Sequence, residues 1–187
     1  NWVFDEKIPV GQFYHVSVDN AVPFNVYGGL QDNGSWYGPS QKAGAIRNND
    51  WTLSFYGDGF YSHRHPTNTD IIYSEYQGGN MVRVNKKTGL GKSIKPFPEK
   101  GDPDLRFNWN APMIQSPSNP DRIYAAAQFL FMSDDMGESW KKISPDLTTN
   151  DPKRQRQKQT GGISIDNSTA ENNTTIYAVA ESTKDAQ

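Results

Sequence analysis

The feature of this sequence that most constrains its fold is a segment pattern that occurs four times. Each copy has a short apolar run, then a polar turn rich in Pro, Asn and Asp, and then a hydrophobic run that carries a tyrosine. These tyrosines are about 50 residues apart, and they are Tyr27, Tyr73, Tyr124 and Tyr177. Such a period indicates a repeat architecture in which each copy is one supersecondary unit.

The residues between the tyrosines favour β-structure. Short β-branched or aromatic runs, which Gly, Asn, Asp and Pro interrupt, show almost no helical periodicity. A period of about 40 to 50 residues is what one four-stranded propeller blade needs. We therefore expect an all-β fold, a partial β-propeller of about four blades, each a four-stranded antiparallel sheet. Strands are expected at Ile71–Tyr76, Met81–Val84, Ile123–Phe131 and Ile176–Ala180.

The repeats divide the chain into roughly equal parts. We expect residues 1–187 to belong to one propeller domain, with repeats at roughly 11–58, 59–109, 110–160 and 161–187, the last incomplete. Closed propellers usually have more blades, and an open arc exposes sheet edges. The chain is therefore expected to be a fragment of a larger propeller, whose remainder lies in the same or another chain.

Composition excludes several classes of partner. The formal net charge of −2 and the pI near 5.9 give no global basic field, so nucleic acid and anionic membranes are poor partners. The basic segment 150–160, which has no apolar side chain to bury, is the one part of the chain that could be helical or disordered, and we expect a long exposed loop there. No stretch reaches the ~18 apolar residues of a membrane span, and the chain has no cysteine.

One short motif predicts a tight hairpin. It runs SDDMGESW over residues 133–140, with Ser133, Asp135, Gly137, Ser139 and Trp140 at the positions that define its pattern. The Asp135 carboxylate is expected to accept backbone N–H bonds, Gly137 to supply a positive φ, and Trp140 to pack beneath the turn. A calcium loop would need a ligand where Met136 stands, so we assign the motif a structural role.

Several motifs together resemble a known family. They read GQFYHVSVDN, VYGGLQDNGSWYGPS, GDGFY, RFNWNAPMIQSP, the SDDMGESW motif and WKKISPDLTTNDP. Their succession from Gly11 to Ser182 resembles the large BNR/Asp-box repeat proteins with sortilin-like propellers, which are often labelled glycosyl hydrolases. The resemblance implies an exported bacterial protein, secreted or on the outer cell surface. A reaction does not follow from it, because fold likeness does not establish chemistry.

Two carboxylates lie in turns that could face a channel. Asp32 follows a strand in QDNGSW, and Asp58 lies between two glycines in GDG. Both have an ordinary interpretation as turn residues. If both reach one mouth of the central channel, they form the acid/base pair of a glycosidase, at a spacing of about 5 Å for retention or 6.5 to 9.5 Å for inversion. Asp32 and Asp58 are thus the candidate catalytic residues.

A polar triplet is the candidate ligand-binding set. If RFNWN is a strand, alternation sends Arg106, Asn108 and Asn110 to one face and Phe107 and Trp109 to the other. The polar face suits sugar hydroxyls or a peptide backbone. The two rings are expected to fill the gap between blades.

No cofactor or metal is expected. His63 and His65 share a strand face, but the only other histidine is His15 and there is no cysteine to complete a zinc site. The sequence also has no G-x-S-x-G, H-E-x-x-H or phosphate-binding loop.

Three functions remain open from the sequence. The first is an exported or cell-surface module that binds a glycan, a peptide or a partner protein. The second is a glycoside hydrolase that acts on a polysaccharide through Asp32 or Asp58. The third is a structural subunit of a larger surface complex, in which a second polypeptide completes the blade edges.

Overall fold

The computed structural model describes residues 11–161 and 170–184, which form three four-stranded antiparallel sheets. In each sheet the strands pair in chain order, so every sheet is an up-and-down meander. The first sheet contains β1 (Phe13–Val18), β2 (Asn25–Leu30), β3 (Gly34–Pro39) and β4 (Thr52–Phe55). The second contains β5 (Gly59–Arg64), β6 (Ile71–Tyr76), β7 (Asn80–Asn85) and β8 (Gly91–Ser93). The third contains β9 (Met113–Gln115), β10 (Ile123–Ala126), β11 (Leu130–Ser133) and β12 (Lys141–Lys142).

In the second and third sheets the second strand is the most buried one. In β6 the central residues are buried on both faces, and every residue of β10 is buried. The repeat tyrosines Tyr27, Tyr73 and Tyr124 lie in β2, β6 and β10, so the sequence period is the period of the sheets. Strands that neighbouring sheets cover on both faces lose the polar alternation of a half-exposed strand.

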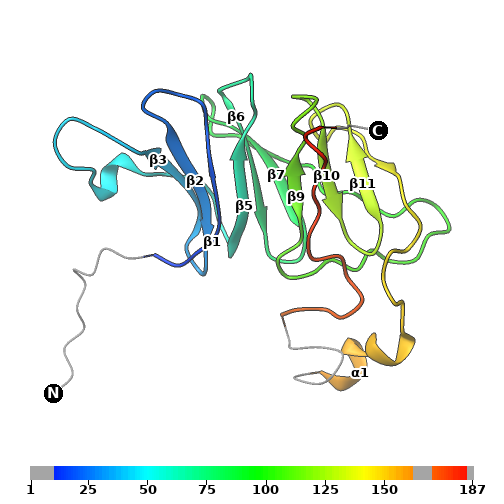
Figure 1. Ribbon diagram of the computed structural model, residues 1–187. Coiled ribbons are helices and arrows are strands. Elements are labelled where there is room, and N and C mark those ends of the chain that lie inside the picture. The colour runs from blue at the N-terminus through cyan, green and yellow to red at the C-terminus, as the bar shows by residue number, and fades with distance from the viewer. Residues whose placement is uncertain (1–10, 162–169, 185–187) are drawn as a thin grey trace, which may run out of the picture.

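The three sheets stand side by side in chain order (Figure 1). Their first strands are neighbours, since β1 contacts β5 and β5 contacts β9. Meander sheets that meet along their first strands are the blades of a propeller. The chain is therefore all-β and forms a partial β-propeller, as predicted.

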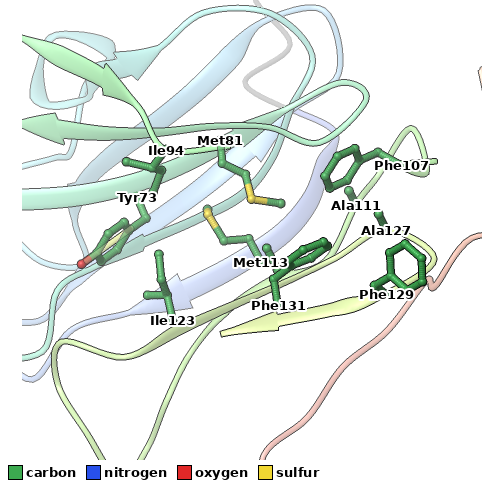
Figure 2. Close-up of a cluster of buried hydrophobic side chains, with 11 residues drawn as sticks. Tyr73, Met81, Ile94, Phe107, Ala111, Met113, Ile123, Ala127, Phe129 and Phe131 are labelled. Carbon is green, nitrogen blue, oxygen red and sulfur yellow. The ribbon is translucent and has the colours of Figure 1, made fainter. Parts of the chain in front are cut away.

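A hydrophobic cluster fills the joint between the second and third blades. Met81 of β7 and Met113 of β9 meet in it, and Tyr73 and Phe131 lie to either side (Figure 2). Phe107 also belongs to it, as expected of a ring that fills the gap between blades. The joint between the first and second blades is built differently, because there two glycine backbones touch. A Cβ on Gly29 would lie 2.1 Å from the backbone of Gly59.

The fourth repeat does not form a sheet in the described residues. Residues 162–169 lie outside them, and the predicted strand Ile176–Ala180 is wrong, because residues 175–182 belong to none of the described sheets. The Ile176 N–H donates to Ala127 O at 2.8 Å, and Glu181 accepts from Ser118 Oγ at 2.5 Å. This segment runs along the third blade (Figure 1).

Segment 150–160 is largely exposed, as expected, and it contains short helical turns instead of a continuous loop. These are the 3-10 helix Pro152–Arg154 and the helix α1 (Gln157–Thr160). Asp151 caps the first by accepting from Lys153 N, with proline at the start of the turn. A third short turn, the 3-10 helix Asn48–Asp50, precedes β4. Within the described residues, no helix has the length and apolar character to cross a membrane.

Candidate functional site

A pocket of about 420 Å³ opens where three loops meet at one end of the first two blades. The β2–β3 hairpin supplies one wall, the segment before β5 supplies the second, and the β6–β7 hairpin supplies Gln77. The pocket is lined by Asp32, Asn33, Gly34, Trp36, Leu53, Tyr56, Gly57, Asp58 and Gln77.

Close backbone contact holds these loops together. The Gly34 N–H donates to Gly57 O at 2.8 Å. A Cβ on Gly59 would lie 2.4 Å from Gly34 O, a separation that side chains do not tolerate. The first two blades therefore approach at this end as closely as two backbones can, which brings their loops into one pocket.

The carboxylates of Asp32 and Asp58 lie together in this pocket. Asp32 adopts a left-handed conformation, φ 58°, which Asp tolerates better than most residues. Its N–H donates to Asp58 Oδ1 at 2.7 Å, and the Asp58 N–H donates to Gln77 Oε1 at 2.8 Å. A side-chain hydrogen bond with Asp58, and then the negative charge of Asp58, raise the pKa of Asp32.

Two aromatic side chains flank the carboxylates. The Trp36 indole N–H donates to Asn33 O at 2.6 Å, which fixes the ring beside the hairpin. Tyr56 is 73% exposed, so its ring is available to solvent. A fixed ring next to charged acceptors suits a ligand with both apolar and polar faces.

Sequence reasoning found part of this pocket. Asp32 and Asp58 were singled out because they lie in turns, and the structure brings them together. Trp36, Tyr56 and Gln77 were missed. Trp36 could have been predicted from the sequence, since it follows Gly34 by two residues in the same QDNGSW motif as Asp32.

The polar triplet lies elsewhere. The predicted strand at 106–110 is wrong, because these residues are loop and turn. Arg106 pairs with Asp146 at 2.7 Å and donates through Nε to Thr174 O at 3.2 Å. Asn108 and Asn110 are buried, with Asn108 donating to Thr175 Oγ1 and Asn110 Oδ1 lying 3.0 Å from His15 Nε2. None of the three lines the Asp32 pocket.

The SDDMGESW turn joins β11 to β12. Ser133 Oγ donates to Asp135 Oδ1 at 2.7 Å, and Ser139 donates to Asp135 through its backbone N–H at 2.9 Å and its hydroxyl at 2.6 Å. Burial alone would raise the pKa of Asp135, but these hydrogen bonds outweigh it and lower the pKa to about 2. Gly137 has φ 85°, and Trp140 packs against the core while its indole donates to Ile94 O at 2.7 Å.

The histidines are engaged in local contacts. His65 Nε2 lies 3.0 Å from Asp121 Oδ1, and its Nδ1 accepts from the backbone of Asn68 at 3.0 Å. His63 packs against Tyr73. In the part of the chain that the structure describes, no three His, Cys, Asp or Glu side chains gather to hold a metal ion.

Fold and pocket define a three-bladed propeller arc with a loop pocket at one end. No protein-family model matches the chain, and no curated protein matches it. Among solved structures it is similar to the crystal structure of a GH74 xyloglucanase from Xanthomonas campestris, at 17% identity and a TM-score of 0.46. That similarity covers 66% of this chain and 19% of the xyloglucanase, so the chain spans about a fifth of that protein's length.

Proposed function

We propose that this propeller arc is a glycan-binding module and that the Asp32 pocket receives the sugar. The observation that carries the proposal is the position of the Trp36 ring, which its own hydrogen bond to Asn33 holds beside two carboxylates. Sugars present apolar C–H faces and a rim of hydroxyls. A ring packs against the C–H faces, and the carboxylates of Asp32 and Asp58 accept strong, charge-assisted hydrogen bonds from the hydroxyls.

The size and character of the pocket support the same proposal. Its volume of about 420 Å³ lies within the ~300 to 1,000 Å³ range of ligand sites. The paired carboxylates disfavour an anionic ligand, so a neutral glycan fits best. As part of this proposal the module works outside the cell, as the resemblance to exported Asp-box proteins implies.

Glycoside hydrolysis is the second candidate function. The raised pKa of Asp32 next to a second carboxylate favours it, because a hydrolase needs one carboxyl group that keeps its proton. The engagement of Asp58 in the turn argues against it, because Asp58 Oδ1 accepts the backbone N–H of Asp32 at 2.7 Å and the Asp58 N–H donates to Gln77 Oε1 at 2.8 Å. We therefore favour binding over catalysis at this pair.

The test is a binding screen against neutral oligosaccharides (cello-, xylo-, manno- and chito-oligosaccharides), followed by calorimetry on the best ligand. Trp36→Ala is expected to weaken binding roughly tenfold, which corresponds to ~1.4 kcal/mol. The matched control is Phe97→Ala, which removes a ring that is 76% exposed and lies outside the pocket lining. Equal affinity of the two variants contradicts the proposal.

A second readout separates binding from hydrolysis. The same oligosaccharides are incubated with the protein, and new reducing ends are measured. We expect none. Reducing ends that appear with the wild type and disappear with Asp32→Asn would show that the protein is a glycoside hydrolase.

A further inference from the structure

A second pocket lies at the end of the blades' first strands that is opposite to the Asp32 pocket. The strand β5 shows this directly, since Asp58 precedes its first residue and Arg64 is its last. Its six residues span roughly 20 Å at the rise of a β-strand, so the two pockets are at opposite faces of the arc. The second pocket has a volume of about 260 Å³ and is lined by Ser17, Val18, Asp19, Asn20, His63, Arg64, Pro66 and Gln115.

All three blades contribute to this pocket. Ser17 lies near the end of β1, His63 near the end of β5, and Gln115 at the end of β9. The Ser17 hydroxyl donates to Ser62 O at 2.7 Å and ties the first blade to the second. The site therefore exists only because the three first strands run alongside one another and end at the same face.

Three residues that line this pocket each carry a polar side-chain atom that is buried without a hydrogen-bond partner among the described residues. These atoms are His63 Nε2, Arg64 Nε and Gln115 Oε1. The Gln115 amide nitrogen, by contrast, donates to backbone carbonyls of the β9–β10 loop, including Arg122 O at 2.8 Å, and this orients the free oxygen. A buried polar atom without a partner costs about 1–3 kcal/mol. Three residues that line one cavity therefore each carry an unmet hydrogen-bonding group.

The charged groups in the pocket balance each other. Asp19 is 2% exposed and already accepts from Ala21 N, Asn25 N, Asn25 Nδ2 and Tyr27 OH, so its oxygens are engaged. Arg64 is 11% exposed, and its Nε lies 3.7 Å from Asp19 Oδ2, too far for a hydrogen bond. A positive and a negative group side by side favour neither an anion nor a cation.

His63 adds a group that both donates and accepts. Burial, and then the nearby His65, lower the pKa of His63 to about 4, so its ring is neutral at physiological pH. A neutral imidazole presents either a donor or an acceptor at Nε2, depending on its tautomer. Arg64 Nε supplies a fixed donor and Gln115 Oε1 a fixed acceptor. A ligand must therefore offer an acceptor to Arg64 Nε and, a short distance away, a donor to Gln115 Oε1. Neighbouring hydroxyl groups offer both.

We propose that the pocket formed by His63, Arg64 and Gln115 binds a small neutral polyhydroxyl ligand of the size of a single sugar residue. The volume sets the size, because it lies below the ~300 Å³ at which sites for larger ligands begin. This site is independent of the glycan site proposed at Asp32, because the two pockets share no lining residue.

The test uses the protein labelled with ¹⁵N-histidine and four free sugars at millimolar concentration: D-glucose, D-xylose, D-mannose and N-acetyl-D-glucosamine. The chain has three histidines, so the imidazole spectrum is simple, and the His63 signals are assigned as those lost in His63→Phe. We expect at least one sugar to receive saturation from the protein and to shift the His63 Nε2 signal. No saturation transfer and no shift with any of the four would mean that the pocket holds only solvent, and would overturn the proposal.

Two variants localise the effect. Arg64→Lys keeps the positive charge but removes the Nε donor, and it is expected to weaken sugar binding about fivefold. Trp36→Ala alters the other pocket and should leave the His63 shift unchanged. A signal that survives Arg64→Lys at full strength but disappears in Trp36→Ala belongs to the Asp32 pocket alone, and contradicts this inference without touching the function proposed there. If Arg64→Lys does not fold, the presence or absence of the His63 shift in the wild type still tests whether the sugar binds in this pocket.

Discussion

The joint between the second and third blades allows a quantitative prediction, for which Met113→Ala is the perturbation. Met113 is 0% exposed and lies in the cluster with Met81 and Ile123. Truncation at Cβ removes an apolar side chain worth about 0.8 kcal/mol per buried methylene and leaves a cavity that the backbone cannot close. Buried Met→Ala changes cost about 2–5 kcal/mol. Because Met113 is fully buried, we expect about 3 kcal/mol.

The assay is equilibrium unfolding in urea, followed by tryptophan fluorescence. A loss of about 3 kcal/mol also lowers Tm by roughly 6–12 °C in a chain of this size. The matched control is Leu90→Ala, which removes a side chain of similar size that is 72% exposed, and it should stay within about 0.5 kcal/mol of the wild type. A Met113→Ala variant that is as stable as Leu90→Ala would refute the conclusion that this cluster holds the two blades together.

Three further changes test other contacts. Asp135→Asn should cost about 1–2 kcal/mol at neutral pH. Folding lowers the pKa of Asp135 to about 2, so this stabilisation is complete above the unfolded pKa of ~3.9 and is lost as the pH falls through about 2. Urea titrations should therefore show the stabilities of the wild type and Asp135→Asn converging near pH 2. A stability difference that is constant with pH contradicts the hydrogen bonds described. Gly59→Ala places a Cβ 2.4 Å from Gly34 O and should destabilise by at least ~1–3 kcal/mol, and an unchanged melting temperature would exclude that contact. Arg106→Ala removes the bonds to Asp146 and Thr174, so limited proteolysis should cleave residues 170–184 sooner than in Arg154→Ala, which alters only an exposed ion pair.

The sequence predicted the fold where its signals were local and repeated. Tyr27, Tyr73 and Tyr124 share one position in three sheets, and the strand Ile71–Tyr76 was predicted with its observed bounds. The predictions failed where a distant residue decides the backbone. At Arg106 the N–H donates to the side chain of Gln128 rather than to a strand, at 2.8 Å. At Ile176 an apolar run pairs with no strand of the described residues.

For the candidate sites, too, local features were predictable and long-range contacts were not. Asp32 and Asp58 were found because turn residues are recognisable along the chain. Their common pocket was not predictable, because it depends on the contact of Gly29 with Gly59, two small residues far apart in sequence. The pocket at Arg64 gave no sequence signal at all, since it requires the ends of β1, β5 and β9 to coincide.

The two joints of the arc differ in mechanical character. At the first, Gly29 and Gly59 bring backbone against backbone, so at that contact no side chain is available to change rotamer. At the second, Met81 and Met113 meet, and methionine is the apolar side chain that adapts most readily to a new shape. We therefore expect the curvature of the arc to be stiff between the first and second blades and compliant between the second and third, so that fitting against further blades adjusts the arc at the methionines and leaves the Asp32 pocket undistorted.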